Sequence, residues 1–265
     1  MNSELKGKWV FITGGSSGFG AAAARAFAAQ GAHVVVVARR GDRLKAVAAE
    51  CAEAGAASAH HHVMDVGSTA SVNACIGWLR ERTGRLDVLV NNAGGAHGVD
   101  TVAEGKDEDW EAMVQVNFLG VLRVTRAALP LLADTPGSLI LNVGSVAGRA
   151  AYEGGSAYCG VKAAALQVTR ALRLELCAAA IRVCTLDPGL AETEFALVRY
   201  KGDRAKADKV YEGIEPLRAE DIAETMVWMA SRPPHVCIDE VVMKCTAQAA
   251  VHKVHRRLPA KGKGH

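Results

Sequence analysis

The chain of 265 residues has few aromatic side chains and little net charge. Phe, Trp and Tyr together make up 5% of it, while Ala and Gly are abundant, a composition that favours helices packed closely on a sheet. The formal net charge of +3 at pH 7 is too small to indicate a nucleic-acid partner. Half of the residues are apolar, so a chain of this length can bury a large core without cross-links.

Cysteine pairs at zinc-ligand spacing are also missing, as is a signal segment. The seven cysteines are an odd number, so free thiols in a reducing compartment are expected. The first six residues, Met-Asn-Ser-Glu-Leu-Lys, contain no apolar signal region. No apolar run looks long enough to span a bilayer. We therefore expect a cytoplasmic protein with no membrane partner.

Short β-branched runs alternate with longer Ala-rich segments of helical period along the whole chain. Apolar strands separated by helices are typical of a parallel sheet covered on both faces. We predict an α/β fold over residues 1–265: a single-domain, Rossmann-like, doubly wound parallel sheet of about seven strands flanked by helices. The predicted strands are 9–13, 33–37, 60–64, 86–91, 138–143, 181–186 and 240–243, and the predicted helices are 19–30, 42–54, 69–83, 107–133, 157–180 and 219–231.

Two segments near the C-terminus fall outside this alternation. Residues 191–216 are charged, are interrupted by Gly202 and Gly213, and follow the sixth predicted strand. Because the carboxyl ends of parallel strands line a ligand crevice, we expect this segment to be a substrate lid. Residues 249–265 form a basic tail, which we expect to be frayed and solvated from His252 onward. Binding of an acidic partner is the alternative role for that tail.

A glycine-rich turn, Thr13-Gly-Gly-Ser-Ser-Gly-Phe-Gly20, follows the first predicted strand directly. Glycine allows a tight turn and a close approach of the backbone to a pyrophosphate, and the next helix offers free N–H groups at its positive end. The spacing alone is a weak signal, but the strand–helix–strand context strengthens it. We therefore predict that a dinucleotide binds at Gly14, Ser16, Ser17, Gly18, Phe19 and Gly20.

The end of the second predicted strand indicates which dinucleotide binds. An NAD site usually has a carboxylate there for the ribose, whereas this chain has Arg39 and Arg40. Arginine makes charge-assisted, bidentate bonds to phosphate. We predict NADP(H), with Arg39 as the first phosphate ligand and Arg40 as the second, unless both merely begin a polar loop. Asp65, followed by Val66, could accept a hydrogen bond from the adenine or could simply be a turn residue.

The run His60-His61-His62 raises the question of a metal site. On a strand only His60 and His62 share a face, and no carboxylate or cysteine at a suitable spacing completes a ligand set. We therefore predict no metal.

Tyr158 and Lys162 stand four residues apart in a predicted helix and share one of its faces. Alone, the pair fits an ordinary helix face with a solvated lysine. A nearby ammonium would lower the pKa of the phenol from about 10 toward the working pH, as a proton donor requires. Ser145, just after the fifth predicted strand, and the upstream glycine turn favour the catalytic interpretation.

Together with Asn91-Asn92-Ala93-Gly94 and Pro188-Gly189, these motifs give the chain a resemblance to the short-chain dehydrogenase/reductase family over nearly its whole length. The resemblance implies a catalytic tetrad and a homotetramer assembled through the helices of Asn117 and Tyr158. Asn117 would hold a water near Lys162, unless it is only a buried structural polar group. The implied tetrad is Asn117, Ser145, Tyr158 and Lys162, and the implied further cofactor contacts are Asn92, Ala93, Gly94, Tyr158, Lys162, Pro188, Gly189 and Thr193.

The segments 194–199, 201–203 and 254–256 are similar to those of the NADP-dependent 3-hydroxy acid dehydrogenases, which include serine and L-allo-threonine dehydrogenases. This resemblance implies an NADP-dependent oxidoreductase that transfers hydride between NADP(H) and a small 3-hydroxy acid or related alcohol or carbonyl. Ser145 and Tyr158 would hold the substrate oxygen. Arg199 would hold its carboxylate, unless that side chain is simply solvated on the surface.

The chain departs from this group at Ser156, where asparagine is usual, and at residues 243–248, which replace a more apolar stretch containing proline. Two other functions remain open. One is reduction of another aldehyde or ketone, such as a sulfonated aldehyde or a secondary metabolite. The other is a non-catalytic NADP-sensing protein, although a sensor has no need of Ser145, Tyr158 and Lys162 together.

Overall fold

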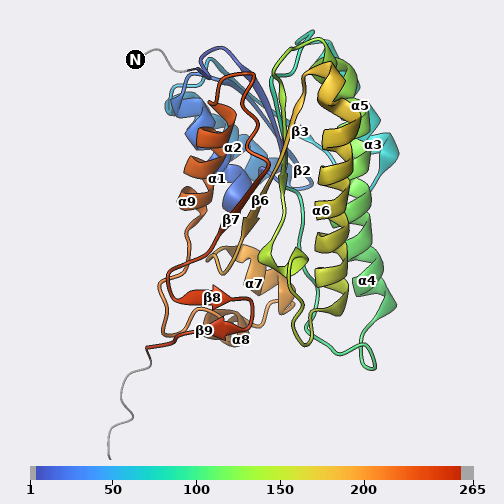
Figure 1. The fold of residues 1–265 in the computed structure, drawn as a ribbon. Helices are drawn as coiled ribbons and strands as arrows, with labels where there is room; N and C mark the ends of the chain where they lie inside the picture. Colours follow the sequence, from blue (N-terminus) through green and yellow to red (C-terminus); the bar gives the residue numbers. More distant parts are fainter. Residues whose placement is uncertain (1–3, 258–265) are drawn as a thin grey trace, which may run out of the picture.

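The computed structural model describes residues 4–257, which form seven parallel strands between two layers of helices (Figure 1). The sheet order is β3-β2-β1-β4-β5-β6-β7, so the winding direction reverses at β1. The predicted doubly wound parallel sheet is confirmed. The strands are β1 (Trp9–Thr13), β2 (His33–Ala38), β3 (Ser58–Val63), β4 (Val88–Asn91), β5 (Leu139–Val143), β6 (Arg182–Pro188) and β7 (Glu240–Met243).

Helices cover both faces of the sheet, and two short helices lie at one end of it (Figure 1). One layer is α1 (Gly18–Ala29), α2 (Gly41–Glu53) and α9 (Ala219–Ala230). The other is α3 (Thr69–Arg80), α4 (Asp107–Val114), α5 (Gly120–Ala133) and α6 (Ser156–Leu176). The remaining elements are the π-helical η1 (Gln115–Leu119), the 3₁₀ turns η2 (Val146–Gly148) and η3 (Cys177–Ala179), the lid helices α7 (Glu194–Arg199) and α8 (Arg204–Lys209), and the hairpin strands β8 (Gln248–Ala250) and β9 (Lys253–Val254).

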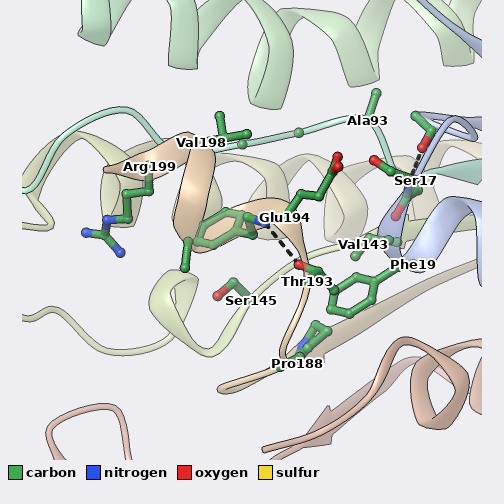
Figure 2. A pocket seen from close by; sticks show the side chains of 18 of the residues that line it. Ser17, Phe19, Ala93, Val143, Ser145, Pro188, Thr193, Glu194, Val198 and Arg199 are labelled. Atoms are coloured by element: carbon green, nitrogen blue, oxygen red, sulfur yellow. Dashed lines mark hydrogen bonds between the residues drawn. The ribbon is translucent and has the colours of Figure 1, made fainter. Parts of the chain in front are cut away.

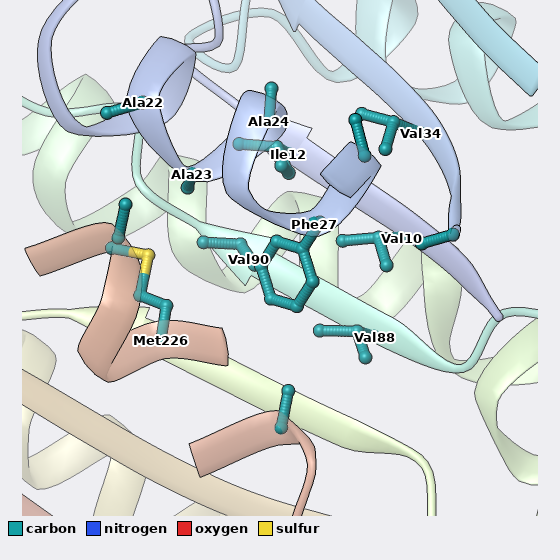
Figure 3. Packing of buried hydrophobic residues seen from close by; sticks show 14 of the residues in the cluster. Val10, Ile12, Ala22, Ala23, Ala24, Phe27, Val34, Val88, Val90 and Met226 are labelled. Atoms are coloured by element: carbon teal, nitrogen blue, oxygen red, sulfur yellow. The ribbon is translucent and has the colours of Figure 1, made fainter. Parts of the chain in front are cut away.

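Alternate side chains of each strand build separate cores on the two faces of the sheet. In β1, Val10 and Ile12 pack toward α1 and α9, while Phe11 packs toward α3 and α5. Phe27 of α1 is fully buried, and its ring lies over Val10 and the neighbouring strand β4 (Figure 3). Small side chains on α1 allow the helix to approach the sheet closely, as the scarcity of aromatic residues led us to expect.

Most predicted elements appear within a few residues of their predicted bounds. The largest strand differences are of two residues: β3 begins early, at Ser58, β4 begins late, at Val88, and β6 ends late, at Pro188. The predicted helix 107–133 is continuous, but it changes to π-helical geometry over Gln115–Leu119. The predicted lid 191–216 contains two short helices that its irregular sequence did not indicate.

The continuous helix Asp107–Ala133 passes the length and composition test for a membrane-spanning helix, with a mean hydropathy of 1.4 over its most apolar window. The expectation that no apolar run is long enough is therefore wrong on these two criteria. Its apolar residues have another explanation in the fold. Val124, Ala128 and Leu131 belong to the core between this helix and the sheet.

The predicted fraying of the tail from His252 is wrong for residues up to 257. Strands β8 and β9 pair antiparallel in this region. The guanidinium of Arg256 donates hydrogen bonds to the carbonyl oxygens of Val210 and Glu212 in the lid, and the backbone N–H of Arg257 donates to Gly213. These bonds anchor the end of the chain to the lid. Residues 258–265 of the predicted tail lie outside the described residues.

We predict that Phe27→Ala lowers the free energy of unfolding by about 3–5 kcal/mol, because it leaves a cavity beneath α1 that the sheet cannot fill. Urea unfolding followed by circular dichroism measures this. Val102→Ala, at a side chain that is 64% exposed, is the control and should change the free energy by no more than about 0.5 kcal/mol. A loss below about 1 kcal/mol for Phe27→Ala would contradict the packing described.

Candidate active site

A cavity of about 540 Å³ lies at the carboxyl edge of the sheet and is closed on one side by lid helix α7. Parallel strands bring the loops that follow them to this one edge, so residues distant in sequence meet there. Two predicted site residues, Gly20 and Asn117, do not line the cavity. Those that line it are Gly14, Ser16, Ser17, Gly18, Phe19, Arg39, Arg40, Asp65, Val66, Asn92, Ala93, Gly94, Ser145, Tyr158, Lys162, Pro188, Gly189, Thr193 and Arg199.

The glycine turn after β1 needs glycine for both conformation and space. Gly14 and Gly18 have φ angles of +66° and +53°, in the left-handed region. A Cβ atom on Gly20 would lie 2.4 Å from the carbonyl oxygen of Gly14 and 2.6 Å from the amide nitrogen of Asn92. Gly20 therefore packs α1 against the turn after β4 and does not face the cavity.

Thr13 was not predicted as a site residue, yet it joins the two turns at this edge. Its hydroxyl accepts hydrogen bonds from the backbone N–H groups of Asn92 (3.0 Å) and Ala93 (2.9 Å) and donates to the carbonyl of Val90. The side chain of Asn92 in turn donates to the carbonyl of Thr13 at 2.9 Å. These bonds set the floor of the cavity between β1 and β4.

The corner beside β2 carries the positive charge expected for a phosphate. The guanidinium of Arg40 donates to the hydroxyls of Ser16 and Ser17, the latter at 2.6 Å, so Arg40 is not merely the start of a polar loop. Arg39 lines the same corner, is exposed, and has no hydrogen bond or ion pair among residues 4–257. Our ranking placed Arg39 first, whereas it is Arg40 that contacts the glycine turn.

A carboxylate that sequence reasoning did not assign also lies in this corner. Glu194, the first residue of α7, pairs with Arg43 of α2 at 2.7 Å and with Arg40 at 3.1 Å. The two guanidinium groups lower the pKa of Glu194, so it is ionised at neutral pH. In the sequence, the only sign of this charged cluster was a third arginine, Arg43, close after Arg39 and Arg40.

At the other end of the cavity, Tyr158 and Lys162 lie on one face of α6, and both are nearly inaccessible, at 8% and 7% exposure. Ser145 lies near the hydroxyl of Tyr158 in the same cavity. The amine of Lys162 lies 5.9 Å from the centre of the Tyr158 ring and donates to the carbonyl of Val143 at 3.0 Å. Phe195 of the lid packs on Tyr158, with ring centres 5.6 Å apart. The structure thus brings three of the four predicted tetrad residues together at the cavity.

Burial dominates the titration of this pair. It raises the pKa of Tyr158 well above its usual value of 10, against the opposing effect of the Ser145 hydroxyl. It lowers the pKa of Lys162 from 10.5 to about 8, while the negative charge of Asp187 acts in the opposite direction. The prediction that Lys162 brings the pKa of Tyr158 down toward neutrality is therefore wrong for this structure. The phenol is therefore protonated in the protein alone, but the raised pKa makes it a weaker acid, so positive charge close to it must favour the phenolate during proton transfer.

Asn117 occupies the π-helical turn η1 and is buried. Its amide donates both hydrogens, to the carbonyls of Gly95 and Met113 at 2.9 Å, and its carbonyl accepts from the N–H of Gly95. A Cβ atom on Gly94 would lie 2.8 Å from the Asn117 oxygen and 3.4 Å from the Lys162 amine. In the structure the Asn117 side chain thus holds the turn after β4, the structural alternative we had left open.

Arg199 faces the cavity at the end of α7 farthest from Glu194. Figure 2 shows Ser17 and Arg199 at opposite ends of the cavity, with Glu194 between them. The guanidinium lies 5.7 Å from the centre of the Tyr158 ring and donates to the hydroxyl of Tyr152 at 2.9 Å. Two other cations of the lid, Lys201 and Arg204, do not line the cavity, and Lys201 pairs with Asp109.

The turn after β6 depends on a residue from the segment that departs from the resemblance. Gln248 is buried, and its carbonyl oxygen accepts a hydrogen bond from the N–H of Leu190 at 2.8 Å. A Cβ atom on Gly189 would lie 2.1 Å from that oxygen, so only glycine fits there. Ser156, the other departure, is exposed at the start of α6 and does not line the cavity.

Two further sequence features can now be placed. Asp65 lines the cavity, and its carboxylate also accepts a hydrogen bond from the N–H of Gly67 at 2.8 Å, so it is a turn residue as well.

His60 and His62 share a face of β3, where both contact the ring of Trp78. Within residues 4–257, no group of three or more His, Cys, Asp or Glu side chains converges in a way that could hold a metal ion.

Comparison with known proteins finds relatives over nearly the whole chain. A sequence model of the short chain dehydrogenase family matches residues 8–202. The chain is 40% identical to the NADP-dependent 3-hydroxy acid dehydrogenase of Schizosaccharomyces pombe, over 96% of this chain and 99% of that protein. It is 42% identical to the sulfoacetaldehyde reductase of Chromohalobacter salexigens, over 91% of this chain and 94% of the relative.

A solved structure is similar in fold as well. The closed form of serine dehydrogenase complexed with NADP+ superimposes with a TM-score of 0.87 at 36% sequence identity. The superposition covers 94% of this chain and 99% of that one.

We predict that the free energy of unfolding of the wild type, compared with that of a Lys162→Met variant, increases as the pH is raised into the alkaline range. Between about pH 8 and pH 10.5 the folded state has released the proton of Lys162, while the unfolded chain still binds it. The free energy of unfolding of the wild type, minus that of the variant, should therefore rise by about 3 kcal/mol over this interval. Urea unfolding of both proteins at neutral pH and near pH 10.5 measures it. A difference that is the same at both pH values would contradict the burial of the ammonium.

Proposed function

The chain belongs to the short-chain dehydrogenase family, and on that premise we propose that it is an NADP-dependent oxidoreductase acting on CH–OH groups. It transfers hydride between NADP(H) and a small 3-hydroxy acid or related alcohol or carbonyl, with Tyr158 as the acid/base. One observation carries the proposal: a single cavity holds a serine–arginine corner at one end and the Ser145–Tyr158–Lys162 group at the other. The corner suits a phosphate, and the other end suits proton transfer to a carbonyl oxygen.

The residues of the cavity fit NADP(H). The left-handed Gly14 and Gly18 leave the backbone open to a pyrophosphate, and the N-terminus of α1 adds its positive dipole end. Arg40 and Arg39 provide guanidinium groups for a ribose phosphate, as the resemblance to NADP-dependent relatives also suggests. Asp65, Ala93 and the residues after β6 line the remaining wall. The cofactor would supply the hydride when bound.

Side chains of the protein donate the proton and orient the substrate. In the direction of reduction, the hydroxyls of Ser145 and Tyr158 bind the carbonyl oxygen, and Tyr158 passes its proton to that oxygen as negative charge develops there. Burial keeps the phenol protonated until that moment. The Lys162 ammonium, 5.9 Å from the ring, favours the phenolate left behind. In the direction of oxidation, Tyr158 takes the proton from the hydroxyl.

The substrate end suits a molecule with an anionic group close to the reacting carbon. In a 3-hydroxy acid only one carbon atom separates the carbinol carbon from the carboxylate. Arg199 lies near the Tyr158 ring and is held there by the hydroxyl of Tyr152 and the carbonyl of Gly98. A guanidinium in that position binds a carboxylate through charge-assisted hydrogen bonds.

A second candidate is the reduction of a sulfonated aldehyde. It is favoured by the 42% identity to a sulfoacetaldehyde reductase, and Arg199 could hold a sulfonate in the same way as a carboxylate. A non-catalytic NADP sensor is a weaker candidate, because a sensor does not need Ser145, Tyr158 and Lys162 converging in one cavity. A screen of cofactors and substrates separates these three functions.

We also propose that the protein is a cytoplasmic homotetramer with no nucleic-acid or membrane partner. The small net charge supports the absence of a nucleic-acid partner. The exposed Leu174 on α6 and Val114 on α4 support association through the long helices. Size-exclusion chromatography with light scattering gives the number of subunits directly.

We expect the wild type to turn over NADP+ with one or more of serine, allo-threonine, 3-hydroxypropionate and 3-hydroxyisobutyrate, and faster than it turns over NAD+. Tyr158→Phe should lose about 10²–10⁴-fold in kcat, because it removes the proton donor and little volume. Absorbance of the reduced nicotinamide follows the reaction. If sulfoacetaldehyde, with NADPH, is the only one of these substrates that is turned over, the second candidate is favoured. Binding of NADP(H) without turnover of any substrate would favour a sensor.

Arg199→Ala should raise the KM for a hydroxy acid by about 10- to 100-fold, the loss expected for one charge-assisted contact. It should leave the KM for an uncharged alcohol unchanged. Arg204→Ala, on lid helix α8 outside the cavity, removes the same charge and is the matched control. An unchanged hydroxy-acid KM in Arg199→Ala would remove Arg199 from the substrate site.

A further inference from the structure

The lid and the phosphate corner are joined by a single carboxylate. Glu194 begins α7, and its two oxygens lie 2.7 and 2.9 Å from one guanidinium nitrogen of Arg43. Arg40, which contacts Ser16 and Ser17 of the glycine turn, is also paired with Glu194. All three charged groups are between 41% and 50% exposed, so an incoming anion can reach them.

The helix that Glu194 begins carries the substrate end of the lid. Only four residues stand between Glu194 and Arg199, and one of them, Phe195, packs on Tyr158. A movement of α7 at Glu194 therefore moves the contacts that cover Tyr158.

We propose that Glu194 is a positioning residue that holds the lid to the phosphate corner and limits affinity for the 2′-phosphate of NADP(H). This rests on the proposed function. The carboxylate and a phosphate dianion compete for Arg40, because both are anions facing one guanidinium. Arg40 is also bonded to Ser16 and Ser17, and we expect these bonds to hold it in place for a phosphate when Glu194 is replaced.

The proposal predicts opposite effects of Glu194→Gln on cofactor and substrate. The Kd for NADP+ should fall about three- to tenfold, because the competing charge is gone. The Kd for NAD+, which has no phosphate at that position, should not change. The KM for the substrate should rise severalfold, because α7 is no longer held down. Glu194→Asp, which keeps the charge, should retain the wild-type Kd for NADP+.

Fluorescence titration gives both Kd values without turnover. Limited trypsin digestion reports on the lid through cleavage after Lys201, Arg204 and Lys206, which should be faster in Glu194→Gln. Glu192→Gln removes the same charge two residues earlier, at an exposed side chain outside the Arg40–Arg43 pairing, and is the matched control.

Suppose that the wild type prefers NADP+ to NAD+ but that Glu194→Gln binds NADP+ with unchanged or lower affinity. That result overturns the inference about Glu194 and leaves the proposed cofactor standing. A wild type with no preference for NADP+ overturns both the inference and the proposed cofactor.

A pair of cysteines lies near the start of β6, at the opposite end of this strand from the cavity, and supports a second, independent inference. The sulfur atoms of Cys184 on β6 and Cys237 before β7 are 3.8 Å apart and share a hydrogen bond. Cys184 is buried and Cys237 is exposed. The hydrogen bond between the two thiols lowers the pKa of Cys237 and, together with burial, raises the pKa of Cys184, so Cys237 is the sulfur more readily ionised.

We infer that Cys184 and Cys237 form a dithiol that a hydroperoxide converts to a disulfide. The Cys237 thiolate attacks hydrogen peroxide, breaks the O–O bond to release hydroxide, and becomes a sulfenic acid. Cys184 then attacks that sulfur, water leaves, and the S–S bond forms. The sulfurs must approach from 3.8 Å to about 2.05 Å. The bond would join the two ends of a segment that contains α7, α8 and α9.

Hydrogen peroxide treatment followed by non-reducing peptide mass spectrometry tests this. We expect a peptide pair joining Cys184 and Cys237 with the loss of two hydrogen atoms, and a higher melting temperature that reverts on reduction. Cys237→Ser should abolish both effects. Oxidation of the exposed Cys177 while Cys184 and Cys237 stay as thiols would overturn the inference.

Discussion

The parallel register of the central strands is the constraint on which the rest of the structure depends. Val90 of β4 lies beside Leu141 of β5, which lies beside Cys184 of β6, so the loops after these strands all leave the sheet at one edge. A buried amide pair strengthens this alignment. Asn91 donates to Asn142 on the next strand at 2.9 Å, and Asn142 donates to Thr169 of α6 at 2.8 Å. The sheet is thereby bonded to the helix that carries Tyr158 and Lys162.

Burial makes these two side chains sensitive to charge that enters the cavity. Tyr158 is kept protonated by its surroundings, and Lys162 is an ammonium whose pKa has fallen to about 8. Each group lies where its charged form is costly, so a change of charge nearby has a large effect on both. The lid adds to this isolation, because Phe195 covers Tyr158 and Glu194 ties the same helix to the arginine corner.

The sheet, the glycine turn and most of the cavity could be predicted because local patterns encode them: β-branched runs, left-handed glycines, and the Tyr158–Lys162 spacing. Other features depend on contacts distant in sequence. Glu194 and Arg40 are 154 residues apart, and no local pattern joins them. Arg256 binds backbone carbonyls of the lid, which have no side-chain signature, so its segment looked like a free tail. The raised pKa of Tyr158 likewise depends on burial by the whole fold, whereas the sequence showed only its nearest charge.

The central claim is that Tyr158 is a buried proton donor whose pKa responds to charge brought into the cavity. The most direct measurement is the pKa of Tyr158 by NMR of protein labelled with ¹³C at the tyrosine ring, with Tyr158→Phe to assign the signal. We predict a pKa above the usual value of about 10 for the protein alone, and a lower pKa after NADP+ is added, because the oxidised nicotinamide is positively charged. A pKa at or below 10 for the protein alone, or one that NADP+ leaves unchanged, would contradict the account.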